Sequence, residues 1–527
     1  MSHALRVGVP KEVFPGERRV AATPSIIKKL TKLGVEVLVE AGAGEGASAL
    51  DAAYSEAGAR VLDTTQLYAE ADIILKVRAP IELGAGAHEV DRLKEGAVLI
   101  CLLWPAQNPE LLQRLSAKKI TTLAMDAVPR ITRAQKMDAL SAMANLAGYR
   151  AVIEGTHAFG RFLGGQSTAA GRIKPARVFV VGAGVAGLAA VAAARALGAV
   201  VTAFDTRPAA REQVKSLGAS FLPFDWKGES GEGEGGYARQ MSEAYLEAEQ
   251  TFIAQEAKNA DVIITTALVP GVPAPKLLTS GAVVSMARGS VIVDLAAEQG
   301  GNCALTESGR AVEKFGVNIL GYTDLLSRMA PQASELYGGT LVALLDEILE
   351  DGQVVIDYAD EVVRGALVVH DGKVTWPPPR PAIRAGAPAP FVPPTVEPPP
   401  RPIGSPWPGR IGLGLLAPGL VLLGIFGSAE LVERMTVFLL ACVVGWHLVW
   451  SVTPALHTPL MSVTNAISGI ILVGGLLLSR GRGLEPGTLV GGAAVLLASI
   501  NVAGGFRVTA RMLRMFQRAP DAAARKK

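Results

Sequence analysis

The sequence predicts an α/β protein with two doubly wound domains, a proline-rich linker and a transmembrane α-helical segment of about four helices. Three observations support this fold class. Short β-branched runs alternate with helical segments over the first 376 residues, a pattern typical of parallel sheets covered by helices. Fourteen of the 33 prolines fall within residues 377–408. Beyond them, no Asp, Glu, Lys or Arg occurs between Met435 and Ser479.

The first domain is expected to alternate strands and helices. Its predicted strands lie at 5–10, 35–40, 73–77, 98–102 and 121–124. A helix at 24–33 is indicated by Thr23 as N-cap and Pro24 as the first helical residue. The glycine-rich segment 42–46, GAGEG, precedes no clear helix, so we interpret it as a loop.

The second domain is organised around residues 177–207, in which Gly182, Gly184 and Gly187 form the pattern G-x-G-x-x-G. The expected elements are a strand at 177–181, a helix from 185 to about 197 and a strand at 200–204. The first glycine permits a tight turn, the second lets the backbone approach a pyrophosphate, and the third lets the helix pack on the strand. The free N–H groups of the helix N-terminus favour the same anion. This pattern predicts a Rossmann-like dinucleotide-binding unit.

Asp205 ends the second strand, 18 residues beyond Gly187, where a carboxylate binds the ribose diol of NAD. An acid at this position repels a 2′-phosphate, which favours NAD over NADP. Arg207 favours NADP instead, because an arginine can bind a 2′-phosphate. We assign Arg207 a structural or pyrophosphate-binding role.

The second sheet is expected to continue with strands at 262–265, 291–294 and 317–321. Residues 227–237, KGESGEGEGGY, contain five glycines and three glutamates and cannot bury apolar area, so they predict a mobile surface loop. Tyr237 at its end is either part of a lid over a nucleotide or an ordinary loop residue. A helix at 331–349 is expected to return to the first domain.

A polar segment at 126–150 joins the first sheet to a long helix predicted to reach about Phe162. Its polar side chains are Arg130, Arg133, Gln135, Asp138, Ser141 and Asn145. One interpretation is a solvated loop and helix start, in which the negative charge of Asp138 interacts favourably with the dipole at the helix N-terminus. The other is a hydrogen-bonding cluster beside the cofactor cleft. Spacing alone leaves both interpretations open.

Charge and cysteine usage restrict the environment of the chain. Residues 411–527 carry ten Lys or Arg and four Asp or Glu, net +6, whereas residues 1–410 carry 41 and 44, net −3. The larger part has no basic patch that would suggest nucleic acid. The three cysteines are far apart and show neither a disulfide framework nor metal-ligand spacing, which fits a reducing compartment. The N-terminus lacks the apolar region of a secretory signal, so we expect the soluble part to be cytoplasmic.

The proline-rich linker is predicted to be an extended tether of about 100 Å at about 3.1 Å per residue. We favour a spacer over a partner-binding motif. The apolar segments beyond it fit four bilayer crossings, at 411–427, 435–453, 460–479 and 486–506. The basic tail is then cytoplasmic by the positive-inside rule, on the same side as the soluble domain. Arg480 and Arg482 would fall in an outside loop, a mild conflict, and the first span is short.

Polar residues within the predicted spans are costly and therefore informative. They are His447, Ser451, His457, Thr464, Asn465 and Ser468. Asn465 and Ser468 are suited to hydrogen bonding between helices as well as to a proton path, and His447 could titrate. The candidate proton-path residues are therefore His447, Asn465 and Ser468.

Seven segments together resemble one family, the alpha subunits of proton-translocating nicotinamide nucleotide transhydrogenases, over nearly the whole chain. They are GVPKEVFPGERRVAATP near the start, LLWPAQNPEL at 102–111, MDAVPRITRAQKMDALSAMANLAGYRA at 125–151, VVGAGVAGLAA at 180–190, TTALVPGVPAPKLL at 265–278, VIVDLAAEQGGNC at 291–303 and TPLMSVTNAISGI at 458–470. The resemblance implies that hydride passes directly between NAD(H) and NADP(H), coupled to proton movement through the membrane domain.

The resemblance also implies roles for individual residues. The nicotinamide-orienting positions fall on Arg130, Gln135, Asp138 and Ser141, which favours the functional interpretation of the polar segment. The mobile-loop tyrosine falls on Tyr237 and the ribose acid on Asp205. The implied cofactor contacts are Arg130, Ile131, Thr132, Arg133, Gly182, Gly184, Val185, Gly187, Asp205, Thr206, Arg207, Gly236, Tyr237, Ala267 and Leu268. No metal site is expected.

The soluble relative alanine dehydrogenase shares the two-domain fold and uses a lysine and a histidine on its keto acid. Lys76 matches that lysine, but Trp104 stands at the histidine position. Oxidation of an amine carbon needs a base, whereas direct transfer between nicotinamides needs none, so this difference favours transhydrogenation. The alternatives are a membrane-anchored dehydrogenase of the alanine dehydrogenase type and a non-catalytic NAD sensor on a membrane partner.

The domain boundaries follow from these observations. They are 1–145 plus 330–376 for the first domain, 146–329 for the NAD-binding domain, 377–408 for the linker, 409–507 for the membrane domain and 508–527 for the basic tail. About 21 residues follow the last span, too few for a nucleotide-binding domain. We therefore expect a separate beta subunit with the NADP(H) site and membrane helices, and a multi-pass location in the cell inner membrane. The resemblance implies self-association through the NAD domain.

Overall fold

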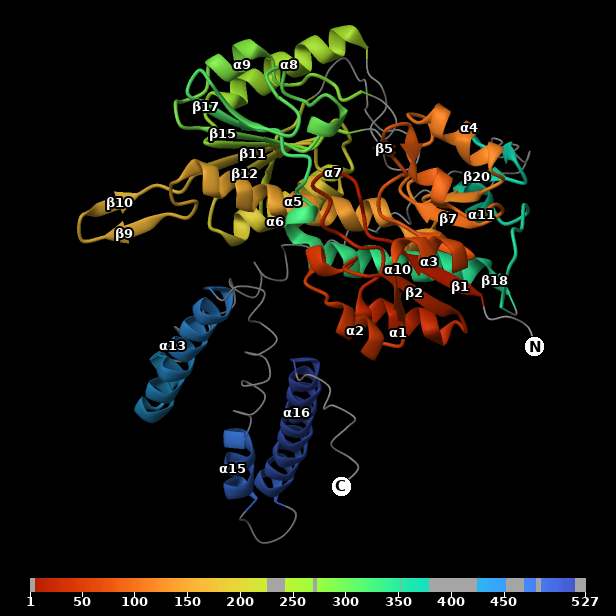
Figure 1. The fold of residues 1–527 in the computed structure, drawn as a ribbon. Coiled ribbons are helices and arrows are strands. Elements are labelled where there is room, and N and C mark those ends of the chain that lie inside the picture. Colours follow the sequence, from red (N-terminus) through yellow and green to blue (C-terminus); the bar gives the residue numbers. More distant parts are fainter. Residues whose placement is uncertain are drawn as a thin grey trace, which may run out of the picture. The chain divides into compact units, whose positions relative to one another are not determined.

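The structure is a computed structural model that describes residues 5–224, 242–268, 273–350, 352–378, 424–451, 469–479 and 485–516. The chain divides into two compact units, residues 1–382 and 383–527, which are described separately. The described residues of the first unit form two large β-sheets with accompanying helices (Figure 1), together with three two-stranded sheets, and those of the second unit form helices.

The first sheet contains eight strands among the described residues, in the order β21-β20-β8-β7-β4-β1-β2-β3. They are β1 (Arg6–Val9), β2 (Glu36–Glu40), β3 (Arg60–Leu62), β4 (Ile73–Leu75), β7 (Val98–Cys101), β8 (Thr121–Ala124), β20 (Leu367–His370) and β21 (Lys373–Val374). The run from β8 to β3 is parallel, and β20 pairs antiparallel with β8. The accompanying helices are α1 (Pro24–Lys32), α2 (Asp51–Glu56), α3 (Thr64–Glu70), α4 (Pro109–Ala117), α10 (Ala330–Ile348) and α11 (Glu361–Ala366).

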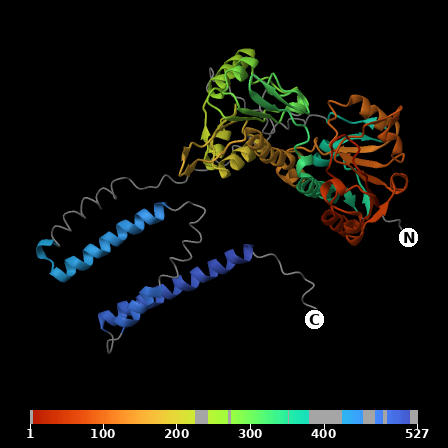
Figure 2. The ribbon, with the colours of Figure 1, turned by 60° about the vertical axis from the view of Figure 1, so that its left-hand side comes forward.

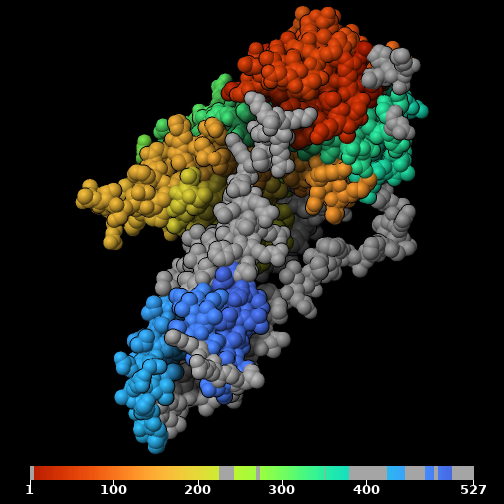
Figure 3. All heavy atoms as spheres, turned by 90° about the horizontal axis from the view of Figure 1, so that it is seen from below, coloured from red at the N-terminus to blue at the C-terminus, as the bar shows by residue number. Residues whose placement is uncertain are grey.

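The second sheet contains seven strands among the described residues, in the order β13-β12-β11-β14-β15-β17-β16. They are β11 (Arg177–Val181), β12 (Val200–Phe204), β13 (Ser220–Phe221), β14 (Val262–Thr265), β15 (Val291–Asp294), β16 (Ala311–Lys314) and β17 (Val317–Leu320). Its helices are α5 (Ala139–Phe159), α6 (Val185–Ala196), α7 (Ala210–Ser216), α8 (Glu243–Ala257) and α9 (Ser280–Val284). A hairpin of β9 (Gln166–Thr168) and β10 (Gly171–Ile173) projects from this part of the unit (Figures 1 and 3).

The expected long helix is split at its start and ends early. Residues 132–137 form the 3₁₀ turn η3 (Thr132–Met137), and α5 begins after Asp138. The helix ends at Phe159 rather than near Phe162, because Gly160 adopts a left-handed conformation with φ of 63° and terminates it. The expected loop at 42–46 includes the short turn η1 (Glu45–Ala47).

Helices α5 and α10 run between the two sheets and contact each other (Figures 1 and 2). Helix α5 also packs on α6 at Gly148, where a Cβ atom would lie 1.9 Å from the carbonyl oxygen of Ala186. Helix α10 packs on α1 at Gly338, where a Cβ atom would lie 2.7 Å from Ile26. Glycine at each crossing therefore lets the helices approach closely.

The segment 330–376, expected to return to the first domain, contributes α10 and β20. Helix α10 packs against α1 and α5, and β20 extends the first sheet beside β8. On α10, the side chains of Tyr337, Leu341 and Leu344 are fully buried in the hydrophobic core beside the first sheet. The exact domain boundaries stay predictions.

The described helices of the second unit are α13 (Ala429–Ser451), α15 (Gly469–Leu478) and α16 (Pro486–Phe516). Helices α15 and α16 pack together where Gly475 faces the carbonyl oxygen of Gly491, 2.9 Å from the position of a Cβ atom. Among the described residues, no helix combines the length and the apolar character needed to cross a membrane. Most of the predicted first span, 411–427, and part of the third, 460–479, lie outside the described residues, so the four crossings stay predictions.

The α5–α6 crossing gives a test of the fold. Gly148→Ala forces a methyl group into the backbone of Ala186, so we expect the free energy of unfolding to fall by about 1–3 kcal/mol. Thermal unfolding of the purified chain, followed by circular dichroism, measures the change. Gly339→Ala on α10 is the matched control, since a Cβ atom there meets nothing within 4 Å. Equal midpoints for Gly148→Ala and the wild type would contradict this packing.

Candidate functional site

The geometry of the turn between β11 and α6 shows why each of the three motif positions is a glycine. Gly182 has φ of 97°, and a Cβ atom on it would lie 2.6 Å from Thr266 Oγ1. A Cβ atom on Gly187 would lie 1.9 Å from the carbonyl oxygen of Gly182, so this position packs helix against turn. Gly184 is different, because a Cβ atom on it would have Arg207 Nη2, at 3.7 Å, as its nearest neighbour. The backbone at Gly184 is thus open to an approaching group, and no side chain caps α6.

Three neighbouring strands bring the predicted residues of this site together. Strand β11 lies between β12 and β14, and all three are parallel. Their carboxyl ends therefore meet at one edge of the sheet and present the glycine turn, the segment 205–207 and the segment 266–268. At the last of these, Ala267 exchanges two hydrogen bonds with the buried side chain of Asn302, at 3.1 and 2.8 Å. Sequence reasoning missed Asn302, because a single amide in a glycine-rich segment carries no signal.

The Asp205 carboxylate accepts hydrogen bonds from the protein on both oxygens. The Ala183 N–H donates to Oδ2 at 2.7 Å, and the Arg207 N–H donates to Oδ1 at 2.8 Å. The Arg207 guanidinium donates to both oxygens, at 2.8 and 2.7 Å. Arg207 therefore pairs with the acid, and its guanidinium also lies beside Gly184. The acid and the glycine turn are held as one unit.

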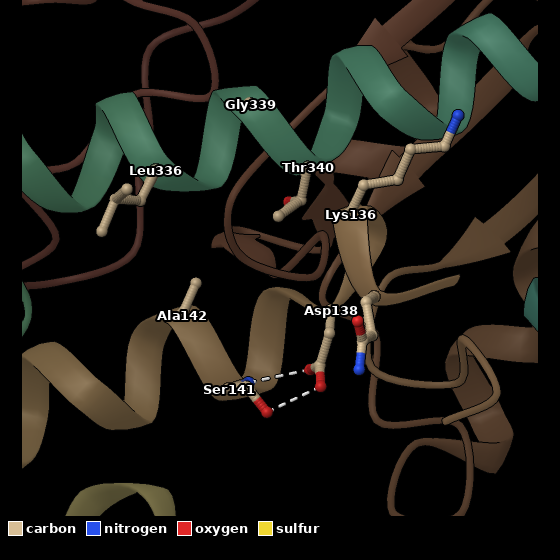
Figure 4. Close-up of a pocket in the computed structure, with 8 residues that line it drawn as sticks. Lys136, Asp138, Ser141, Ala142, Leu336, Gly339 and Thr340 are labelled. Atoms are coloured by element: carbon tan, nitrogen blue, oxygen red, sulfur yellow. Dashed lines mark hydrogen bonds between the residues drawn. The ribbon is translucent and has the colours of Figure 1, made fainter. Parts of the chain in front are cut away.

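The polar segment forms a second cluster at the start of α5. Asp138 caps the helix, accepting from the Ser141 N–H at 2.8 Å and from the Ser141 hydroxyl at 2.6 Å (Figure 4). Arg130 Nε lies 3.9 Å from Asp138 Oδ2. Asp138 and Ser141 border a cavity of about 560 Å³ between α5 and α10. Its lining residues are Gln135, Lys136, Asp138, Ser141, Ala142, Leu336, Gly339 and Thr340.

Arg133 stands apart from the other residues of the polar segment that were expected to contact a cofactor. Its guanidinium donates to Glu347 on α10 and to both carboxylate oxygens of Asp360, at 2.8 and 2.7 Å. These carboxylates neutralise its charge and tie η3 to the returning segment. The neighbouring Ile131 is half-buried against the first core, and Thr132 is exposed.

Several predicted residues cannot be placed. Gly236 and Tyr237 lie outside the described residues, as do Asn465 and Ser468. His447 lies within α13, but its side chain is not described. Their assignments stay predictions.

Lys76 is enclosed by protein carboxylates. Its side chain is 1% exposed, and its ammonium lies 2.7 Å from Glu89 Oε1 and 3.2 Å from Glu12 Oε2. Burial would lower the pKa of Lys76, but these two acids hold it above its ordinary value. Nearby, Trp104 has φ of 52°, and its N–H donates to Asp126 at 2.9 Å. The lysine is therefore part of a buried ionic cluster.

A second buried ionic cluster links the two sheets. The Glu17 side chain is fully buried and pairs with Arg19 and, at 2.9 Å, with Arg78. Arg78 also pairs, at 2.8 Å, with the exposed Glu298 of the 3₁₀ turn η5 (Ala297–Gln299), which follows β15. Burial would raise the pKa of Glu17, but the hydrogen bonds and charges of these arginines, with the Ser327 hydroxyl, hold it far below its ordinary value.

Taken together, the fold and the site define a two-domain dinucleotide-binding protein. Family models match the chain in three parts: "Alanine dehydrogenase/PNT, N-terminal domain" at residues 8–147, "Alanine dehydrogenase/PNT, C-terminal domain" at 151–377, and "4TM region of pyridine nucleotide transhydrogenase" at 434–518.

Full-length relatives agree. The NAD(P) transhydrogenase subunit alpha of Haemophilus influenzae is 50% identical, covering 98% of this chain and 100% of the relative. That of Cereibacter sphaeroides is 47% identical with the same coverage. The crystal structure of transhydrogenase from Sinorhizobium meliloti is 42% identical, with a TM-score of 0.62, covering 71% of this chain and 99% of that one. The chain belongs to the NAD(P) transhydrogenase subunit alpha family.

The Glu17 cluster makes a prediction about stability and pH. Glu17→Gln leaves the buried Arg19 without its counter-charge and Arg78 with Glu298 alone, so we expect a loss of about 3–5 kcal/mol in the free energy of unfolding at pH 7. Because the pKa of Glu17 is lower in the folded state than its ordinary value of 4.5, its contribution is complete above that value and fades as the pH falls below it. Thermal unfolding at pH 7 and pH 4 measures the difference.

The matched control is Glu95→Gln, which removes an acid from an exposed pair with Lys119. We expect its midpoint to stay at the wild-type value at pH 7. A Glu17→Gln midpoint as high as that of this control at pH 7 would contradict the stabilising role of the cluster.

Proposed function

We propose that this chain is the NAD(H)-binding subunit of a transhydrogenase that moves hydride between NAD(H) and NADP(H), coupled to proton translocation. The observation that carries the proposal is the meeting of the glycine turn, Asp205 and the segment 266–268 at one sheet edge, in a chain of this family. The glycine turn fits a pyrophosphate, because the backbone at Gly184 is open to an approaching group. At Gly182 and Gly187, by contrast, neighbouring protein atoms crowd the position of a Cβ atom.

The glycine turn and the N-terminus of α6 would hold the pyrophosphate through backbone N–H groups. Asp205 would accept from a ribose hydroxyl in place of one of its hydrogen bonds from Arg207, and its pairing with Arg207 leaves that arginine with little charge to offer a 2′-phosphate. Both features favour NAD(H) over NADP(H) on this chain. The segment at Ala267 and Leu268 borders the same edge and would complete the wall of the site.

The polar cluster at the start of α5 would orient the nicotinamide. Asp138 and Ser141 are fixed by their mutual hydrogen bonds, Arg130 lies beside Asp138, and Gln135 lines the same cavity as Asp138 and Ser141. At 1.5 Å per residue, Asp138 lies about 15 Å along the helix axis from Gly148, where α5 touches α6. One rigid helix would therefore set the spacing between the nicotinamide end and the pyrophosphate end of the site.

Direct hydride transfer between two nicotinamides needs no protein base, and bound NAD(H) supplies the hydride chemistry. The protein has to bring the rings to reacting distance, about 3–3.5 Å, and keep water away. The enclosure of Lys76 supports this function over an alanine dehydrogenase activity, since its ammonium is already bound by Glu12 and Glu89.

We assign NADP(H) binding and most of the proton path to a beta subunit. The apolar C-terminal part, which matches the 4TM family model, would pack against the helices of that subunit in the cell inner membrane. The proline-rich linker would let the NAD domain reach its partner domain on the cytoplasmic side. Self-association through the NAD domain, and roles for His447, Asn465 and Ser468 in the proton path, belong to this proposal.

Asp205 tests cofactor selectivity. Asp205→Asn removes the ribose acid and leaves Arg207 without its counter-charge, so we expect NADH binding to weaken by about 1–3 kcal/mol and the preference over NADPH to shrink. Calorimetric titration of the purified chain with each nucleotide measures both effects. Glu212→Gln, an exposed acid on α7, is the control and should bind NADH like the wild type. Equal wild-type affinity for NADH and NADPH would refute the assignment.

Reconstitution tests the reaction and its subunits. We expect NADPH-dependent reduction of an NAD analogue by the chain with its partner in detergent, and no robust turnover by the chain alone. In the complex, Arg130→Ala should abolish hydride transfer because the nicotinamide is no longer oriented. Arg114→Ala, an exposed arginine on α4, should keep full activity. Robust turnover by the chain alone would refute the two-subunit assignment, and turnover of alanine or pyruvate would favour a dehydrogenase.

A further inference from the structure

Helix α8 carries one acid on its buried face. The buried residues of this helix are Tyr245, Glu249, Ile253 and Ala257, which follow one another at intervals of four and form one stripe. Glu249 is 2% exposed, whereas Glu247 on the same helix is exposed. No hydrogen bond joins the Glu249 carboxyl to another of the described residues. A carboxyl at such a position is costly and calls for a function.

The aromatic contacts of α8 locate this carboxyl beside the cofactor site. On one side of Glu249, the Tyr245 ring lies 5.3 Å from the Phe224 ring, measured between centroids. On the other side, the Phe252 ring lies 5.5 Å from the Phe204 ring. Phe204 is the last residue of β12 and immediately precedes Asp205. The buried face of α8 therefore covers the end of the strand that presents the ribose acid.

The electrostatic environment of Glu249 favours its neutral form. Burial, and then the charge of Asp205, raise the pKa of Glu249 to about 7. Among the described residues, two cations lie near these acids. Arg207 is paired with Asp205, and the Lys276 ammonium donates a hydrogen bond to the Gly300 carbonyl, while the Lys276 carbonyl accepts from Gln250 of α8. The remaining titratable group on this face of α8 is the Tyr245 phenol, one turn away. Near neutral pH the protonated and ionised forms of the carboxyl are thus both populated, and the protonated form can donate a hydrogen bond.

We propose that the protonated carboxyl of Glu249 is a hydrogen-bond donor of the NAD(H) site beside Asp205, and that its ionisation weakens NAD(H) binding. The two acids have different roles: ionised Asp205 accepts a hydrogen bond from a ribose hydroxyl, and neutral Glu249 donates one to an acceptor oxygen of the nucleotide. When Glu249 loses its proton, it can no longer donate and adds a second negative charge next to an anionic ligand. The inference rests on the proposed assignment of the NAD(H) site to this chain.

The test is a fluorescence titration of the purified full chain in detergent with NADH, between pH 6 and pH 8. For the wild type we expect the Kd to rise about tenfold over this range, the change for one proton with a pKa of about 7 that is needed for binding. Glu249→Gln keeps a donor that cannot ionise, so its Kd should stay at the wild-type value for pH 6 throughout. Calorimetry at pH 8 in two buffers of different ionisation heat should show uptake of one proton by the wild type and none by this variant.

The control is Glu247→Gln, which should keep the wild-type pH profile because its side chain is exposed. If Glu249→Gln and the wild type show the same pH profile, or if the wild-type Kd is constant over the range, the inference is overturned while the NAD(H) assignment stands. If the wild type binds NADH at no pH in this range, the assignment of the site fails, and the inference fails with it.

Discussion

The contact between α5 and α6 at Gly148 is the constraint on which the arrangement of the site depends. Helix α5 begins with the Asp138–Ser141 cap in the first domain and meets the dinucleotide turn of the second domain ten residues later. Because the backbones of the two helices touch there, no side chain intervenes whose rotation could alter the spacing. A single helix thereby relates the two polar clusters that together are proposed to hold one nucleotide.

The buried charges of the first unit show a consistent pattern, in which cations are matched by carboxylates of the same chain. Lys76 lies between Glu12 and Glu89, and Arg78 connects Glu17 to Glu298. Such pairs cost desolvation energy and are strongly destabilising to break, so they fix geometry more than they add stability. Glu249 departs from this pattern, because no cation among the described residues forms an ion pair with it and burial favours its proton instead.

The unit of β11, α6 and β12 in the second domain was predictable because strong local signals coincide there: β-branched strands, three glycines and a terminal acid. Strands β3 and β16 were missed because they are short or half-exposed and lack an apolar run. The pairing of Arg133 with Glu347 and Asp360 was also invisible, since its partners lie more than 200 residues away in sequence. Likewise, Glu249 resembles any helical glutamate until the packing of α8 shows which face is buried.

The enclosure of Lys76 also bears on how related activities can interconvert. A single Trp104→His change would supply a base but leave the lysine held by Glu12 and Glu89 within the core. A keto-acid site would thus also require the removal of Glu12 and Glu89. Removal of either acid leaves a buried charge without one of its partners, which destabilises the folded domain. A change of activity at this position therefore requires several coordinated substitutions rather than one.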